Sequence, residues 1–120
     1  MTNELKKYVD GIRDEIKNLY EADYTDEERD ELEANGEAFD LWSYFADPLD
    51  YEFTISSRGD FLGVKVWVTL GGPNVWIDTR EECVKGAWGS DREESYLQPE
   101  ICQEIDSIFE EYYNITTGRV

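Results

Sequence analysis

The chain has 120 residues, the length of one small domain, and its 40% hydrophobic and 14% aromatic content suffices for a buried core. Its 29 acidic residues against 11 basic ones give a net charge of −18. Because such a charge repels nucleic acid and anionic membranes, we expect the protein to bind neither directly and to attract basic partners instead.

The N-terminal part, residues 1–47, is predicted to be helical and strongly acidic. Over residues 4–21, apolar side chains recur every three or four positions, which is typical of a helix with one buried face. A second, short helix is expected to begin at Thr25, because Thr25 and Glu28 have the spacing of a capping box. Asn35-Gly36 is a typical stop and predicts the end of this helix.

The second predicted helix is a surface helix, because Leu32 is its only large apolar residue. A third helical segment is expected over residues 37–46, which contain four large apolar side chains. This segment is predicted to end at Asp47-Pro48, since the residue before a proline disfavours the helical conformation.

The middle of the chain, residues 50–88, is predicted to form a sheet, because apolar and polar residues alternate there. Strands are expected at residues 51–56, 61–70 and 74–79 and, with a weaker pattern, at 82–88. Their short connections predict an antiparallel meander of three or four strands. The polar residues 89–98 are expected to form a loop before a C-terminal helix over residues 99–114. Residues 1–120 are therefore predicted to form one α+β domain, in which N-terminal helices and one C-terminal helix pack on the sheet.

The residue types do not predict an enzyme. The chain has no histidine, which is the commonest general base and the usual partner of a Ser or Cys nucleophile. Asp23 begins an acidic stretch, but Glu28 stands where a calcium-binding EF-hand loop needs glycine. Cys83 and Cys102 fit no metal-ligand spacing. We expect no catalytic residue, no metal site and no cofactor.

The two cysteines also bear on the expected location of the protein. Residues 1–10 contain no apolar stretch of the kind found in secretory signals, and no apolar run approaches the ~20 residues that span a membrane. A cytoplasmic location is therefore expected, in which Cys83 and Cys102 remain reduced thiols. A disulfide between them is the alternative.

The densest acidic stretch, residues 21–52, offers a candidate contact surface. Carboxylates three or four positions apart on a helix have their Cβ atoms ~5–6 Å from one another. Such a row of negative charge is similar to the phosphates that a nucleic-acid-binding groove accepts. The stretch is either a solvated face that keeps the protein soluble or a surface that occupies such a groove by imitation. The candidate partner-binding residues are Asp26, Glu27, Asp30, Glu31, Glu33, Glu37 and Asp40.

Trp67 and Trp76 offer an alternative partner-binding surface. In the predicted strand pairing they lie on the face opposite the apolar stripe of the two strands. Either a helix covers this second face, or the aromatic rings form a platform for a partner. Because three apolar helices are predicted and one sheet face usually takes two, the covered arrangement is favoured.

Four short motifs lie between Val68 and Tyr113: Gly71-Gly72-Pro73, Val75-Trp76-Ile77, Gly86-Ala87-Trp88-Gly89, and the helix from Glu104-Ile105 to Glu111-Tyr112-Tyr113. In these motifs the chain resembles small acidic proteins of phages and other mobile elements. Some proteins of that kind block CRISPR or restriction systems, several of them as DNA mimics. The resemblance implies an anti-CRISPR or antirestriction role. It does not extend to residues 1–50, so the acidic contact surface is predicted from charge alone.

These observations predict a non-enzymatic acidic inhibitor that binds a basic, nucleic-acid-binding host-defence protein, such as a CRISPR effector or a restriction enzyme, and competes with its nucleic acid. The alternative is an interaction or homodimeric assembly module that binds through Trp67 and Trp76, with the charge serving solubility. Adaptation of the surface to high salt is a third interpretation of the acidic composition.

Overall fold

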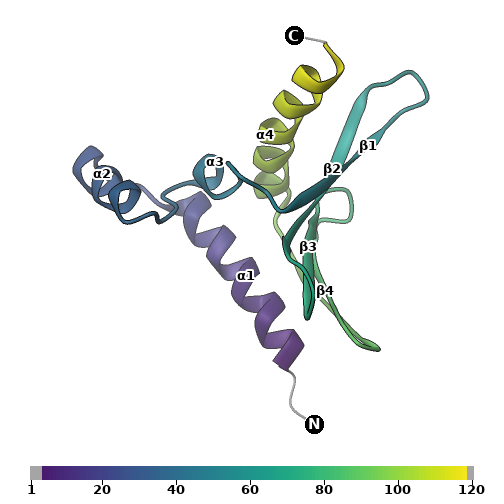
Figure 1. Ribbon diagram of the computed structural model, residues 1–120, viewed down its shortest axis with the longest axis horizontal. Helices are drawn as coiled ribbons and strands as arrows, with labels where there is room; N and C mark the ends of the chain where they lie inside the picture. Colours follow the sequence, from purple (N-terminus) through teal and green to yellow (C-terminus); the bar gives the residue numbers. More distant parts are fainter. Residues whose placement is uncertain (1–3, 119–120) are drawn as a thin grey trace.

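The computed structural model describes residues 4–118. Within these residues a five-stranded antiparallel sheet has the strand order β1-β2-β3-β4-β5, so every strand pairs with its neighbours in the sequence. The fold is α+β, with N-terminal helices and a C-terminal helix, as predicted (Figure 1). In chain order the elements are α1 (Glu4–Glu21), α2 (Asp26–Ala34), α3 (Leu41–Tyr44), β1 (Asp50–Ile55), β2 (Phe61–Thr69), β3 (Asn74–Asp78), β4 (Cys83–Trp88), β5 (Asp91–Tyr96) and α4 (Pro99–Thr117).

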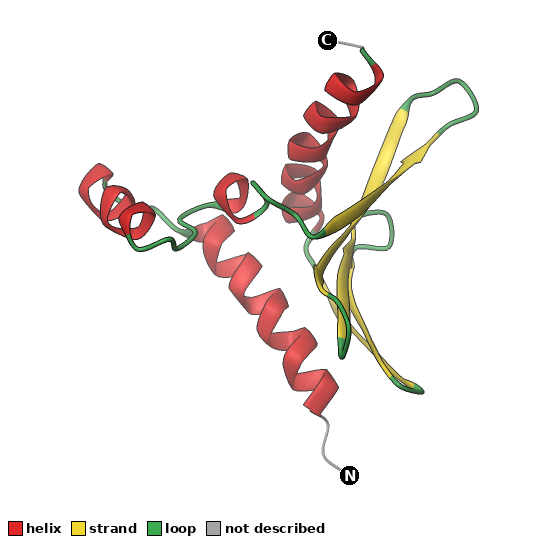
Figure 2. Cartoon of the chain, viewed as in Figure 1, coloured by secondary structure: helices red, strands yellow, loops and turns green. Residues whose placement is uncertain are grey.

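The helices that pack on the sheet all lie on one of its two faces (Figure 2). Helix α1 packs against β4 and β5, α4 packs against β2, and the short α3 contacts both α1 and α4. In the part of the chain that the structure describes, no helix covers the opposite face of the sheet (Figures 1 and 2). We call this second face the open sheet face. Helix α2 projects away from the two layers (Figure 1).

The core fills the space between the covered sheet face and the helices. Alternate residues of the central strands point into it, as the two-residue period of a strand requires. At the β1 edge, the Tyr51 ring lies 5.4 Å from the Phe109 ring, and the Phe53 ring lies 5.3 Å from that of Tyr113. The buried cluster consists of Leu5, Val9, Ile16, Leu41, Phe45, Val64, Val66, Val75, Ile77, Val84, Leu97, Ile101, Cys102, Ile105, Ile108 and Phe109.

Local sequence signals set the bounds of the first two helices where they were predicted. Helix α1 covers the predicted residues 4–21. The Thr25 hydroxyl accepts a hydrogen bond from the Glu28 amide (3.2 Å), and the Glu28 carboxylate accepts one from the Thr25 amide (3.1 Å). At the other end, Asn35 caps α2 and Gly36 follows with a φ of +73°, a left-handed conformation that favours glycine. The predicted capping box and helix stop are both confirmed.

Two other helices differ in length from the prediction. The apolar pattern predicts a helix over residues 37–46, whereas α3 has only four residues. Its start is set by Asp40, whose carboxylate accepts a hydrogen bond from the Ser43 amide (2.8 Å), while the Ser43 hydroxyl accepts one from the Asp40 amide (3.1 Å). This second capping box leaves the preceding residues outside the helix. Helix α4 continues beyond the predicted residues 99–114 to a left-handed cap at Gly118.

The sheet has one strand more than predicted. Residues 89–98 were expected to form a loop, but β5 lies within them and pairs with β4 from Trp88↔Asp91 to Cys83↔Tyr96. The composition of this edge strand does not indicate a strand, because most of its residues are charged and only Ser95 is buried. The signal that identifies it is Gly89-Ser90, a two-residue pair of the kind that connects hairpin strands, with Gly89 at a φ of +60°.

Helix α1 packs tightly against Gly86 on β4, and this contact yields a prediction for stability. A Cβ atom at this position would lie 2.5 Å from Val9 Cγ2 and 2.9 Å from Leu5 Cδ1, both in the core. We therefore expect Gly86→Ala to lower the free energy of unfolding by ~1–3 kcal/mol through overpacking.

Denaturant unfolding measures this effect, and Gly11→Ala is the matched control. Gly11 lies within α1, and a Cβ atom there would meet no heavy atom within 4 Å. Replacing a glycine inside a helix by alanine should raise stability by ~0.5–1 kcal/mol. Equal stability of the Gly86→Ala variant and the parent would show that α1 does not pack on β4 in this way.

Candidate partner-binding surfaces

Within residues 4–118, no group of three or more Cys, Asp or Glu side chains is arranged to hold a metal ion. No helix in the same range is both long and apolar enough to cross a membrane. Two surfaces of distinct character are the candidate sites.

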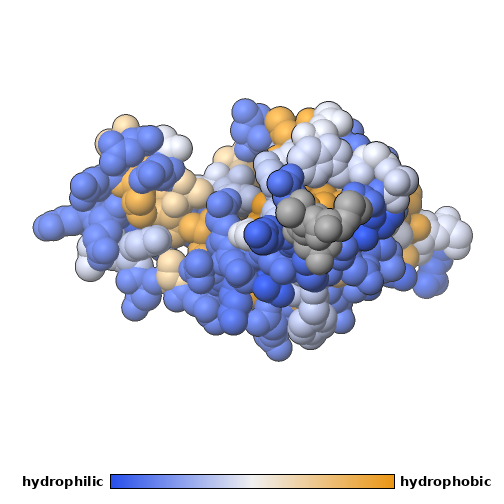
Figure 3. Space-filling model, turned by 90° about the horizontal axis from the view of Figure 1, so that it is seen from below, coloured by the Kyte–Doolittle hydropathy of each residue, from blue (hydrophilic) through white to orange (hydrophobic). Residues whose placement is uncertain are grey.

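The first surface is helix α2, which has no buried residue. Five of the candidate residues lie on it with exposed side chains: Asp26, Glu27, Asp30, Glu31 and Glu33. Glu37 is exposed just beyond the helix. The space-filling view shows α2 as a lobe that stands apart from the main body and has a mostly hydrophilic surface (Figure 3). We call these six residues the acidic arm.

Asp40 has a different role from the other candidate residues. It is half-buried, and its carboxylate caps α3 through the hydrogen bond from the Ser43 amide. A carboxylate that satisfies a helix N-terminus has one acceptor position fewer for a partner. The Asp40-x-x-Ser43 spacing is the sequence signal for this capping role. The structure thus separates Asp40 from the acidic arm.

The acidic arm has little opposing positive charge. Arg29 is the only basic residue of α2, and its guanidinium lies 5.4 Å from the centre of the Phe39 ring as a cation–π contact. Among the described residues, no carboxylate of α2 forms an ion pair. Asp26 with Asp30 and Glu27 with Glu31 are like-charged pairs one turn apart, and each pair costs the helix ~0.2–0.5 kcal/mol.

The second surface is the open sheet face, on which Trp67 and Trp76 lie. The favoured sequence interpretation, that a helix covers these two rings, is wrong, because all the helices that pack on the sheet take the other face. The two residues are register partners on β2 and β3, and their rings stack 6.0 Å apart with an angle of 26° between the planes. Both side chains are half-buried.

The strand register places other side chains of the open sheet face in rows across the strands. The central row is Asp50, Trp67, Trp76, Lys85 and Glu94. The next row is Glu52, Lys65, Asp78, Cys83 and Tyr96. Acidic and basic residues therefore alternate beside the tryptophan pair, and cross-strand neighbours of opposite charge stabilise a sheet.

Two basic side chains of this face, Lys85 and Arg92, have partners within the chain. Lys85 Nζ lies 2.6 Å from a Glu81 carboxylate oxygen, and this hydrogen bond raises the pKa of Lys85 and lowers that of Glu81. The Arg92 guanidinium donates to the carbonyls of Gly89 (2.9 Å) and Asp91 (2.8 Å) in the β4–β5 turn. A hollow of about 460 Å³ opens beside these groups, lined by Trp76, Lys85, Gly86, Arg92, Glu93 and Glu94.

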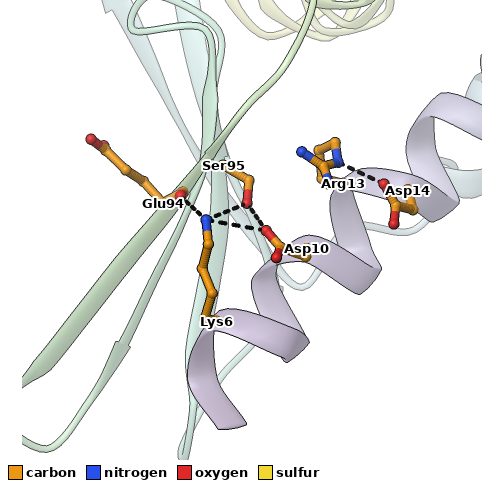
Figure 4. Close-up of polar contacts among 6 residues, drawn as sticks. All are labelled: Lys6, Asp10, Arg13, Asp14, Glu94 and Ser95. Atoms are coloured by element: carbon orange, nitrogen blue, oxygen red, sulfur yellow. Dashed lines mark hydrogen bonds and ion pairs between the residues drawn. The ribbon is translucent and has the colours of Figure 1, made fainter. Parts of the chain in front are cut away.

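A polar cluster joins α1 to the edge strand β5 (Figure 4). Lys6 Nζ lies 3.2 Å from Asp10 and donates hydrogen bonds to the Glu94 carbonyl (2.8 Å) and the Ser95 hydroxyl (3.2 Å). The Ser95 hydroxyl in turn donates to Asp10. The hydrogen bond from Ser95, followed by the contact with Lys6, lowers the pKa of Asp10 despite the opposing effect of burial. The cluster fastens the helix to the sheet.

Cys83 and Cys102 are free thiols, as expected, and both are buried. The Cys102 thiol lies 3.7 Å from the Leu97 carbonyl, and the Cys83 thiol lies 3.8 Å from a Glu94 carboxylate oxygen. Burial raises the pKa of Cys83 to about 11 and that of Cys102 to about 12. Neither thiol has the lowered pKa that a nucleophile or metal ligand needs.

Comparisons with protein families, with curated proteins and with solved structures find no match to this chain. The similarity to small acidic proteins of mobile elements therefore remains a prediction from the sequence motifs.

The thiols give a prediction about reactivity. A thiol reagent at neutral pH should react slowly with the native protein, because both cysteines are buried and few of their thiols are ionised. In denaturant without a reductant, both cysteines should react. Recovery of no reactive thiol from the unfolded protein would establish a disulfide instead.

The Asp10 cluster gives a prediction about acid stability. Because the pKa of Asp10 is lowered in the folded state, its ionised form stabilises the fold above the ordinary pKa of 3.8. This stabilisation is lost as the pH falls through the folded-state pKa. Asp10→Asn should therefore lose less stability than the parent on acidification. Thermal unfolding between about pH 6 and pH 2 measures the difference.

Ser95→Ala provides a second measurement of the same contact. Loss of its hydroxyl removes the main cause of the lowered pKa of Asp10, so this variant should also be less sensitive to acid than the parent. Acid profiles of both variants that run parallel to the parent would rule out a role of this cluster in acid stability.

Proposed function

We propose that the protein is a non-enzymatic acidic inhibitor that binds a basic, nucleic-acid-binding protein and competes with its nucleic acid. The observation that carries this proposal is the acidic arm. Its helix has no buried residue, projects from the body and presents exposed carboxylates without ion-pair partners in the described chain.

The geometry of α2 suits imitation of a phosphate backbone. A helix holds its carboxylates in fixed rows, and Cβ atoms three or four residues apart are ~5–6 Å from each other. Carboxylates and phosphates accept the same charge-assisted hydrogen bonds from Arg and Lys. The Thr25–Glu28 capping box and the Arg29–Phe39 contact order the arm before it meets a partner, which lowers the entropy cost of binding.

The amount of charge also favours a contact surface over a merely solvated one. A small domain needs a net charge of only about 2–8 in magnitude to stay soluble, and this chain has −18. The like-charged pairs of α2 reduce its stability, so they are a cost that solubility does not require. Long-range attraction between such a surface and a basic groove speeds association.

The target class that we propose is a host-defence protein, such as a CRISPR effector or a restriction enzyme. Its support is the resemblance of residues 68–113 to small acidic proteins of phages and mobile elements. The competitive mode of action is supported separately, by the charge and exposure of the acidic arm.

A four-residue variant tests the proposal: Glu27→Gln, Asp30→Asn, Glu31→Gln and Glu33→Gln. These changes remove four negative charges from the arm with little change in shape, and they relieve repulsion within α2. The variant should be folded and at least as stable as the parent. Its inhibition of nucleic-acid binding by a sensitive effector or restriction enzyme should fall by about an order of magnitude or more. The reason is that the variant loses both the long-range electrostatic attraction to the target and the charge-assisted hydrogen bonds.

The matched control removes four charges elsewhere: Glu4→Gln, Glu100→Gln, Glu110→Gln and Glu111→Gln. These side chains are exposed on α1 and α4, so the net charge changes equally while the arm stays intact. The control should inhibit nearly as well as the parent. We would abandon the proposal if the arm variant inhibited as well as the parent, or if the target bound nucleic acid and this protein together at saturation.

A further inference from the structure

The open sheet face is a second interaction surface, and we propose that a second copy of this chain binds there. The proposal is independent of the inhibitory function, because the acidic arm projects on the helix side of the sheet and the open face points the other way (Figure 1). The occupant is inferred from three features of the face: its nearly balanced charge, its aromatic centre and the protection of the sheet edges.

A nearly balanced charge distinguishes the open sheet face from the chain as a whole. Its three basic residues, Lys65, Lys85 and Arg92, stand among five acidic ones, Asp50, Glu52, Asp78, Glu81 and Glu94, so the face has a net charge of −2. The whole chain has a net charge of −18, so most other surfaces of two copies repel each other. A two-fold interface brings the same patch of both copies together, so each basic residue of one patch can face a carboxylate of the other.

The same features argue against a small anionic ligand on this face. Lys65 stands between Glu52 and Asp78 in its row, and Lys85 is paired with Glu81 at 2.6 Å. A phosphate or carboxylate would have to displace these neighbours and would then face their negative charge. A protein surface with both signs of charge offsets this cost, because it brings cations to the acidic neighbours as well as carboxylates to the lysines.

The aromatic content of the face suits a protein interface. Trp, Tyr and Arg are the residue types that dominate binding energy at such interfaces, and the face presents Trp67 and Trp76 at its centre with Tyr96, 60% exposed, at its β5 edge. Two sheets pack face to face about 10 Å apart with interdigitating side chains. The hollow of about 460 Å³ beside Trp76 leaves room for a side chain of the second copy.

The two edges of the sheet are poor alternatives for self-association. Edge strand β1 presents Asp50 and Glu52, and edge strand β5 carries consecutive charged residues from Asp91 to Glu94. Charged side chains on an edge oppose strand-to-strand pairing between molecules. Self-association is therefore expected through the sheet face and not through extension of the sheet.

Salt distinguishes this contact from binding through the acidic arm. Two copies with −18 each repel one another outside the nearly balanced face, and added salt screens that repulsion, to a Debye length of about 3 Å at 1 M. The dimer should therefore strengthen as salt is added. Binding of a basic target by the arm weakens with salt, so the two contacts respond in opposite directions.

Sedimentation equilibrium of the full chain at low and high salt tests the proposal. The parent should show a monomer–dimer equilibrium that shifts toward dimer with concentration and with salt. Trp67→Thr and Trp76→Thr should each weaken the dimer by about 30-fold or more, as loss of a hot-spot residue does. Trp88→Thr is the matched control: Trp88 is 43% exposed on the same sheet but alternates onto the helix side, and its loss should leave the dimer unchanged.

A charge exchange keeps the test decisive if the tryptophan variants do not fold. The double variant Lys65→Glu, Lys85→Glu makes the face negative. The double variant Glu52→Lys, Glu94→Lys makes it positive. Each variant alone should be monomeric, because two copies of it would bring like charges together. An equimolar mixture should form a heterodimer. Three results would each overturn the proposal. The parent could stay monomeric at high concentration and high salt, the dimer could be unaffected by the loss of Trp67 and Trp76, or the mixed charge variants could fail to pair.

Discussion

The burial of one sheet face beneath α1 and α4 is the packing arrangement on which the rest of the molecule depends. It requires a close approach of α1 to β4, and Gly86 permits this because a larger residue would meet Val9 and Leu5. These two helices and α3 fill the covered face. Helix α2, with Leu32 as its only large apolar side chain, has no place in this layer and extends into solvent.

The parts of the fold that local signals determine could be predicted from the sequence. The apolar period places α1, and the capping box of Thr25 and Glu28 places α2, because both signals act within a few residues. Strand β5 was missed, because one side of an edge strand faces solvent and its composition is that of a loop. The covered face was predicted, but the covering of the second face by a helix was wrong: with apolar residues on both sides of β2 and β3, the pattern does not determine whether helices cover one face or both.

The candidate surfaces were predictable to different degrees for the same reason. The acidic arm follows from a local run of carboxylates, and only Asp40 was assigned a role that the structure gives to helix capping. The open sheet face depends on pairing between strands distant in the sequence. The row from Asp50 to Glu94 becomes visible only when the register of all five strands is known. The mixture of acidic and basic residues on that face is therefore a property of the fold rather than of any segment.

The position of α2 relative to the sheet has a consequence for valency. If two copies join through their open sheet faces, the helix layers lie on the outside and the two acidic arms point away from each other. Arms that diverge in this way cannot both reach adjacent grooves of one target molecule. Binding of the first arm therefore does not raise the effective concentration of the second arm at that target. They would instead bridge two separate target molecules, and the stoichiometry of the assembly would then be one target per arm.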